Sequence, residues 1–221
     1  MQSFDHFISS LRKSLLQPLP GKNVQYEMAS MFRRNEILAL ESITGFKESA
    51  VCILLYEKDG EIVFPLIERV VYDGVHSGQI AFPGGKKDET DPDLKITALR
   101  ELHEETGIKV DEENVAGQLS QLYIPPSNFM VSPFVASLHQ PPQFQISEFE
   151  VQQVVECSLS ELLNDAIIKE TIVTVANGLK IKTPYFDIRG KVVWGATAMI
   201  LNELKFIIRS NDATSSFFRS R

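Results

Sequence analysis

The chain has 221 residues, of which 43% are hydrophobic, 23% charged and 9% aromatic. This is the make-up of one globular domain and excludes a disordered chain, a collagen-like rod and a coiled coil. With 22 Lys and Arg against 29 Asp and Glu, the formal net charge is −7, which argues against nucleic acid as a partner. Apolar runs fall far short of the ~20 residues of a membrane-spanning helix, and residues 1–20 lack a signal-peptide core. We therefore expect a cytoplasmic protein with no membrane partner.

Residues 1–49 are predicted to form an N-terminal helix and a wrapping segment that pack on the body of the protein. Within residues 2–16 the apolar side chains recur at helical spacing, and they are Phe4, Phe7, Ile8, Leu11 and Leu15. A cluster of helix breakers, Pro18 to Gly21, ends this helix. Residues 22–49 show no clear period and are expected to be irregular.

The body, residues 50–210, shows a pattern of strands, turns and helices. Strands are expected at 50–57, 61–69, 78–82, 116–124, 130–138, 151–157, 171–176 and 179–186. Helices are expected over 91–107, with Asp91 and Gly107 as its caps, over 158–165 and over 195–208. This order favours an α/β fold, a mixed sheet with helices on both faces. Residues 211–221 are expected to be a flexible tail, and Cys52 and Cys157 to be small buried apolar residues.

The helix expected after Asp91 carries three carboxylates on one face. Glu101, Glu104 and Glu105 fall within an arc of about 100°. The opposite side, with Ile96, Leu99, Leu102 and Thr106, is expected to face the core. Like charges at this spacing repel one another, and they lie near the negative end of the helix dipole. A helix with this face is stable only if another interaction offsets the repulsion.

Two interpretations of these carboxylates are open from the residues alone. One is a solvated acidic face, with Arg100 and Glu104 as an ordinary i,i+4 ion pair. The other is a divalent cation site, because Mg²⁺ prefers carboxylate oxygens together with substrate phosphates. The turn of Gly84 and Gly85 just before the helix favours the second interpretation, since glycines let backbone approach a metal or a phosphate closely.

At these residues the chain resembles the Nudix family. Arg100–Ile108, RELHEETGI, matches the R-E-U-x-E-E-x-G-U half of the Nudix box, where U is a bulky apolar residue. Gly85 matches the glycine that opens the box. The sequence departs from the usual box at Asp91, which replaces a Glu, and at Arg100, which lies one residue further on. The resemblance implies a Nudix-type α/β/α sandwich.

Further segments are similar to the Nudix enzymes that cleave coenzyme A. Residues 65–69, PLIER, precede 76–85, HSGQIAFPGG, and residues 127–135 and 193–198 resemble later blocks of that branch. The similarity covers about residues 50–201. Val70 and Gly74 stand where that branch often has Ser and Arg, so a second phosphate-binding Arg is missing. The resemblance implies Mg²⁺- or Mn²⁺-dependent cleavage of coenzyme A into 4′-phosphopantetheine and adenosine 3′,5′-bisphosphate.

The resemblance also implies a role for each residue of the box. Glu101 and Glu105 are expected to be direct metal ligands, and Glu104 to share a second metal or its waters and to take part in catalysis. Gly84 is expected to lend its carbonyl to the metal. Arg100 is expected to serve catalysis by orienting the glutamates.

The remaining candidates lie outside the helix. Glu150 matches a loop glutamate that acts as general base, with a solvated loop acid as the alternative. Arg69 is a candidate phosphate ligand, with a structural ion pair as the alternative. Gly85 is expected to lie against the substrate. Asn128 and Phe129 are expected to line the pocket for the non-adenine half.

The sequence leaves the roles of other side chains and the exact function open. Trp194 is expected in the core, His103 on the helix surface and His76 in the loop before Gly78. The alternatives to coenzyme A are another substrate, such as an oxidised nucleotide, a dinucleotide or a nucleotide sugar, or a sensor that binds nucleotide without cleaving it. Homodimer formation is left open.

Overall fold

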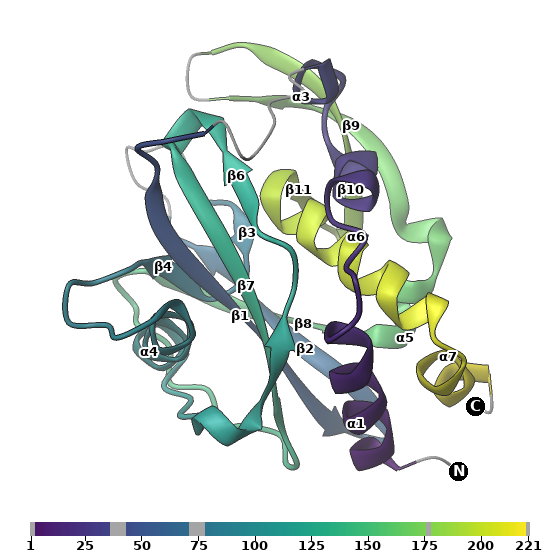
Figure 1. The fold of residues 1–221 in the computed structure, drawn as a ribbon. Helices are drawn as coiled ribbons and strands as arrows, with labels where there is room; N and C mark the ends of the chain where they lie inside the picture. Colours follow the sequence, from purple (N-terminus) through teal and green to yellow (C-terminus); the bar gives the residue numbers. More distant parts are fainter. Residues whose placement is uncertain (1–2, 36–42, 71–77, 176–177, 220–221) are drawn as a thin grey trace.

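The computed structural model describes residues 3–35, 43–70, 78–175 and 178–219 (Figure 1). Its strands are β1 (Lys47–Lys58), β2 (Glu61–Arg69), β3 (Ile80–Ala81), β4 (Gly84–Lys86), β5 (Val115–Gln118), β6 (Leu122–Ile124), β7 (Phe129–Leu138), β8 (Val151–Ser158), β9 (Ile168–Thr174), β10 (Lys180–Ile188) and β11 (Lys191–Trp194). Its α-helices are α1 (Phe4–Leu15), α2 (Lys22–Gln25), α3 (Met31–Asn35), α4 (Leu94–Thr106), α5 (Leu159–Leu163), α6 (Gly195–Ser210) and α7 (Asp212–Arg219). Short 3-10 turns are η1 (Tyr26–Met28), η3 (Glu112–Asn114), η4 (Pro125–Ser127) and η5 (Asp165–Ile167).

The main sheet is mixed, as predicted. Its strand order is β3-β2-β1-β7-β5, while β4 pairs with β1, β6 with β7 and β8 with β2. The central pair, β1 and β7, is parallel and runs in register from Lys47↔Phe129 to Tyr56↔Leu138. All other pairs are antiparallel. The strands β11, β10 and β9 form a separate, smaller sheet.

Helices cover both faces of the main sheet, which confirms the α/β/α sandwich (Figure 1). Alternate side chains of β1 point to opposite faces. Cys52 and Leu54 pack with Leu102 of α4, and Ile53 and Leu55 belong to the larger core with α1 and α6. Because both faces of β1 are covered, its sequence is almost continuously apolar. Cys52 and Cys157 are buried free thiols, as expected.

The segment after α1 is more ordered than its sequence suggests. It forms α2, η1 and α3 rather than irregular chain. Glu203 of α6, fully buried, accepts hydrogen bonds from the Gly21 amide at 3.1 Å and from Gln25 Nε2 at 2.8 Å. The Asn202 amide group donates to the Val24 carbonyl at 2.8 Å. Residues far apart in sequence thus fasten this segment, so local periodicity does not reveal it.

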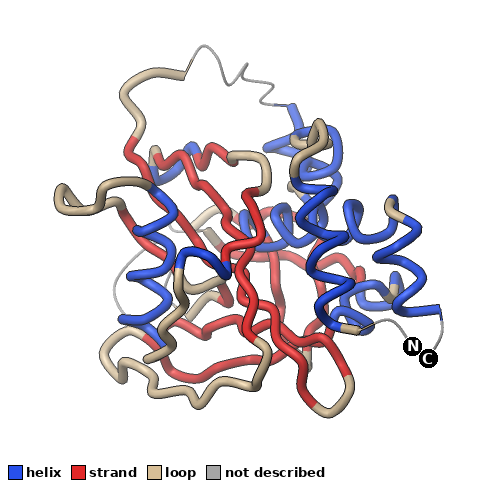
Figure 2. Tube along the Cα trace, turned by 60° about the horizontal axis from the view of Figure 1, so that its bottom comes forward, coloured by secondary structure: helices blue, strands red, loops and turns tan. Residues whose placement is uncertain are grey.

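Two elements near the C-terminus differ from the predictions. The strand β11 is not predicted, because its turn with β10 uses Arg189 and Gly190 at positive φ rather than the common Asn-Gly pair. Residues 212–219, expected within a flexible tail, form α7, which places Phe217 in the core with its ring 5.5 Å from that of Phe7. Helices α1 and α7 lie side by side (Figure 2). None of the helices among the described residues is long and apolar enough to cross a membrane.

Candidate functional site

Helix α4 carries the acidic residues, and its ends are well defined. Asp93 caps the N-terminus, with its side chain accepting from the Ile96 amide at 2.9 Å. The prediction of Asp91 as this cap is therefore wrong by two residues. At the other end Gly107 adopts φ 76° in the left-handed region and closes the helix, as predicted. The helix thus ends at Thr106, with Gly107 as its C-cap.

The two glycines before the helix are required by close packing. A Cβ on Gly85 would lie 2.4 Å from the Glu101 carboxyl group, and one on Gly84 would lie 2.4 Å from the Ala50 carbonyl oxygen. Strand β4, which contains both glycines, pairs with β1 through Ala50 and Val51. The Glu101 carboxylate therefore rests on the backbone of Gly85, where any larger residue would displace it.

Glu105 lies at the centre of the site. Its side chain is fully buried, and it accepts from Arg69 Nη1 at 2.9 Å and from the Gly84 amide at 2.8 Å. Burial raises its pKa to about 7; Arg69 and the Gly84 amide oppose this rise, while the negative charges of Glu101 and Glu150 add to it. Glu105 is therefore not on a solvated acidic face, which corrects that interpretation for this residue.

Glu101 and Glu150 complete a group of three carboxylates with Glu105. Burial raises the pKa of Glu101, with Glu104 and Glu150 adding to the rise and Arg100 opposing it. Glu150 is exposed in a turn whose position is fixed, because the Ser147 amide donates to the Glu105 carbonyl at 3.1 Å and the Val70 amide donates to the Glu150 carbonyl at 3.0 Å. Glu101, Glu105 and Glu150 are called the carboxylate group below. Glu150 thus lies close enough to affect the pKa of Glu105, although the two residues are 45 positions apart in sequence.

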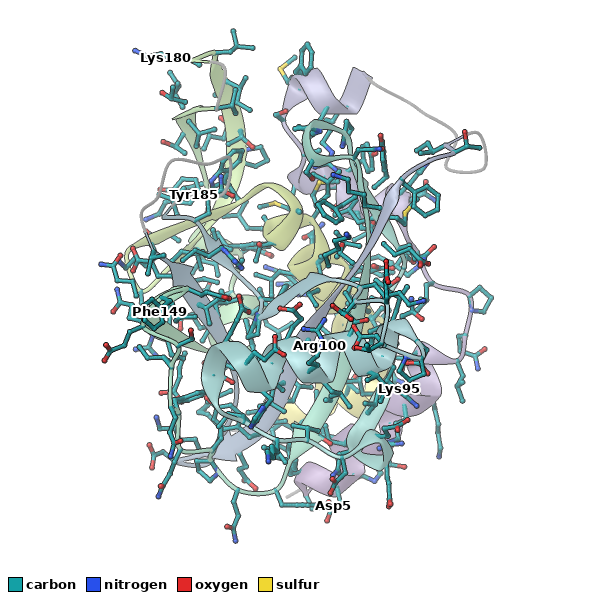
Figure 3. The ribbon with its side chains drawn as sticks, turned by 90° about the vertical axis from the view of Figure 1, so that its left-hand side faces the viewer. Asp5, Lys95, Arg100, Phe149, Lys180 and Tyr185 are labelled. Carbon is teal, nitrogen blue, oxygen red and sulfur yellow. The ribbon has the colours of Figure 1, made fainter. Side chains whose placement is uncertain are left out.

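Arg100 joins this group to the loop before the helix. Arg100 lies on α4 (Figure 3). Its Nη1 donates to both Glu101 and Glu104 at 2.9 Å, and its Nη2 donates to Asp91 at 2.9 Å. Asp91 is 6% exposed and also accepts from Thr97 Oγ1 at 2.9 Å. The hydrogen bond from Arg100 is the main reason that the pKa of Asp91 falls to about 2. Asp91, at the position where the sequence departs from the box, is therefore the anchor of Arg100.

The donor set fits a hard divalent cation in its chemistry. In the part of the chain described by the structure, no group of three Asp, Glu, His or Cys side chains is arranged to hold a metal ion as it stands. Both oxygens of Glu105 have protein partners, and Glu104 is exposed and paired with Arg100. However, the negative charges of Glu101 and Glu150 add to the rise in the pKa of Glu105, and a cation bound by carboxylate oxygens would offset that repulsion.

The other candidates lie in different surroundings. Asn128, at φ 54°, accepts from the Tyr123 hydroxyl at 2.9 Å and donates to the Gly45 carbonyl at 3.0 Å. Phe129 packs against the core, with Lys47 Nζ 5.7 Å from its ring centroid. These contacts shape the start of β7. His103 is half-buried on α4.

Trp194, expected in the core, is only half-buried at the end of β11, because the strand lies at the edge of the small sheet. His76 and Gly74 lie outside the described residues. Thr97 and Ser147, which position Asp91 and the Glu150 turn, were not identified from the sequence, because hydroxyl residues carry no distinctive spacing.

Comparisons with known proteins agree with this architecture. The family model described as NUDIX domain matches residues 46–174. The chain is 36% identical over 129 residues to the human mitochondrial coenzyme A diphosphatase NUDT8, covering 58% of this chain and 54% of that protein. It is 33% identical over 169 residues to the uncharacterized Nudix hydrolase NudL of an Enterobacter species, covering 72% and 81%. The crystal structure of the Nudix hydrolase RenU from M. smegmatis superposes with a TM-score of 0.50 at 13% identity, covering 76% and 89%, and so shares the fold.

Proposed function

The chain belongs to the Nudix hydrolase family, and from this premise we propose that it cleaves the diphosphate bridge of coenzyme A. Water adds to one phosphorus atom, a bridging P–O bond breaks, and the products are 4′-phosphopantetheine and adenosine 3′,5′-bisphosphate. The observation that carries the proposal is the carboxylate group with Arg69 at its edge, because diphosphate hydrolysis needs a centre for cations and a positive group for phosphate.

Two observations support coenzyme A over other diphosphates. Residues 65–69 and 76–85 resemble the segments typical of the coenzyme A branch, and Arg69 from the first of them contacts Glu105. The human relative named above is a coenzyme A diphosphatase. This chain covers only about half of that relative, so the shared substrate is part of the proposal.

Glu101 and Glu105 are proposed to hold Mg²⁺ or Mn²⁺, with Glu104 sharing a second ion or its waters and the Gly84 carbonyl as a further ligand. A bound divalent ion would neutralise charge on the diphosphate and favour deprotonation of water. Arg100 keeps Glu101 and Glu104 in place through its hydrogen bonds to both. Because Arg69 shares Glu105 with the Gly84 amide, a cation on Glu105 would leave the guanidinium available for a phosphate oxygen.

Glu150 is proposed as the general base that accepts the proton of the attacking water. It is exposed, it belongs to the carboxylate group, and its turn is fastened to Glu105 and Val70 by backbone hydrogen bonds. Gly85 gives the substrate close access to the backbone, because no side chain covers it there. Asn128 and Phe129 remain predictions for the non-adenine half.

A substrate panel tests the proposal. Coenzyme A, dephospho-coenzyme A, 8-oxo-dGTP and a dinucleotide are incubated with Mg²⁺, with Mn²⁺ and with EDTA, and products are separated by chromatography. We expect coenzyme A to be cleaved fastest and EDTA to abolish turnover, with the Glu105→Gln protein as the inactive control. Faster cleavage of 8-oxo-dGTP or of the dinucleotide would refute coenzyme A as substrate. Tight binding without turnover of any compound would instead establish a nucleotide sensor.

A further inference from the structure

A groove of about 350 Å³ lies between the main sheet and the small sheet, apart from the carboxylate group. The edge strands β3 and β11 contact each other there (Figure 1). One wall is formed by Gly78 to Ile80, and the other by residues of β9 and β11 that include Thr171, Val192 and Trp194. Trp194, which is half-buried, is one of the residues that line the groove.

The groove is separated from the reaction centre by the end of one strand. Glu68 borders the groove, and the next residue of β2, Arg69, contacts Glu105 on the other face of the sheet. The backbone of Arg69 also donates to the Gln79 carbonyl at 3.1 Å. Neighbouring strands are about 4.8 Å apart, so the groove and Arg69 lie close to each other at this edge of the main sheet.

The charges along the groove are balanced. Lys191 Nζ lies 2.7 Å from the Glu68 carboxylate, which also accepts from Gln153. Among the described residues that line the groove, Lys191 is the only cation, and its ammonium group is paired with Glu68. Its other exposed side chains are apolar: Ile172 is 66% exposed and Val192 is 40% exposed. These properties suit an uncharged ligand with apolar segments.

We propose that this groove binds the pantetheine arm of the substrate, an inference that rests on the proposed function. The arm is an uncharged, extended chain with a dimethyl group, two amides and a thiol. Its dimethyl group matches Val192 and Trp194. Strands β3 and β11 each end the strand order of their sheet in the described residues, and an edge strand presents backbone groups that pair with the amides of an extended chain. The phosphorylated adenosine is excluded from the groove by the balanced charges.

Val192→Ser tests the assignment because it removes apolar contact at a position that is exposed in the fold. The matched control is Ile168→Ser, which changes a residue of similar exposure, 37%, on the same small sheet but outside the groove. Coenzyme A hydrolysis is measured together with inhibition by the two products, and the melting temperature confirms folding. We expect Val192→Ser to raise the KM for coenzyme A and the Ki of 4′-phosphopantetheine by about five- to tenfold. The Ki of adenosine 3′,5′-bisphosphate stays unchanged, as do all constants of the control.

Two results would overturn the assignment. A matching rise in the Ki of adenosine 3′,5′-bisphosphate would place the adenosine half in the groove, stacked on Trp194. Unchanged constants for coenzyme A and 4′-phosphopantetheine would place the arm elsewhere, for example at Asn128 and Phe129. If the wild-type protein does not cleave coenzyme A, the proposed function fails, and calorimetric titration with 4′-phosphopantetheine tests the assignment of the groove separately. Binding of 4′-phosphopantetheine that is weakened by Val192→Ser but not by Ile168→Ser supports the assignment. Absence of binding to the wild-type protein refutes it.

Discussion

Asp91→Asn is expected to destabilise the protein because Asp91 anchors Arg100. The carboxylate accepts from Arg100 Nη2 at 2.9 Å, from Thr97 Oγ1 at 2.9 Å and from the Asp88 amide at 3.0 Å. A carboxyl group whose pKa falls from 3.8 to about 2 on folding contributes roughly 2.5 kcal/mol to stability at neutral pH. The side chain of Arg100 is 27% exposed, so screening by water reduces this to about 1–2 kcal/mol.

The stability that Asp91 contributes should depend on pH in a definite direction. Because the folded-state pKa of Asp91 is lowered, its contribution is fully present above pH 3.8 and is lost as the pH falls towards about 2. Urea denaturation should therefore show a free energy of unfolding about 1–2 kcal/mol lower for Asp91→Asn than for wild type at pH 7. The difference in the free energy of unfolding between the variant and wild type should become smaller between pH 4 and pH 3. Turnover should also fall, since Arg100 positions Glu101.

Asp93→Asn is the matched control for this experiment. It removes a carboxylate only two residues away, but Asn caps a helix N-terminus about as well as Asp. We expect its free energy of unfolding to stay within about 0.5 kcal/mol of wild type. The reasoning about Asp91 is refuted if both variants lose the same stability at pH 7, or if the gap between Asp91→Asn and wild type persists unchanged to pH 3.

The other predictions concern activity. Glu105→Gln should lower kcat about a thousandfold, which corresponds to roughly 4 kcal/mol, and activity within a few-fold of wild type at saturating Mg²⁺ would exclude the residue as a metal ligand. The carboxylate of Glu105 accepts from two donors, Arg69 and the Gly84 backbone amide. The side-chain amide of Gln can accept from only one of them through its oxygen, so the free energy of unfolding should fall by about 1–3 kcal/mol. Glu150→Gln should lower kcat at least a hundredfold and leave the melting temperature unchanged. The control Glu148→Gln, in the same exposed turn, should retain activity. Equal losses of kcat in the two variants would exclude Glu150 as the general base. Gly85→Ala should lower activity because the added Cβ would lie 2.4 Å from the Glu101 carboxylate and displace it. Full activity would show that the observed position of the Glu101 carboxylate is not needed. Coenzyme A should be preferred to dephospho-coenzyme A by only about tenfold in kcat/KM, since the chain lacks the second Arg of the branch, and a preference above a hundredfold would contradict this.

The main architecture was predictable because its signals are local. Helix α4, its C-terminal glycine and the hairpin of β1 and β2 each follow from patterns within a few residues. The environment of Glu105 was not predictable, because a helical wheel places all three glutamates on one face without showing which of them the sheet covers. In the structure Glu105 is fully buried, Glu101 is half-buried and Glu104 is exposed.

Partners that are distant in sequence account for the rest. Arg69 reaches Glu105 across 36 residues and Gln25 reaches Glu203 across 178, and neither pairing has a spacing that a sequence pattern could reveal. The cap of α4 was misplaced because Asp91 and Asp93 both suit an N-cap. In the structure the Asp91 carboxylate accepts a hydrogen bond from Arg100, while Asp93 caps the helix.

The docking of α1 against the far end of the chain has a consequence during translation. Phe7 and Leu11 of α1 are fully covered in the folded protein, and Phe7 packs against the rings of Phe217 and Phe218. Roughly 200 residues are synthesised between α1 and these partners, which takes about 10–40 s at ribosomal rates. The apolar stripe of α1 therefore leaves the ribosome well before the surface that covers it exists. During that interval Phe7 lacks the two aromatic rings that cover it in the folded protein.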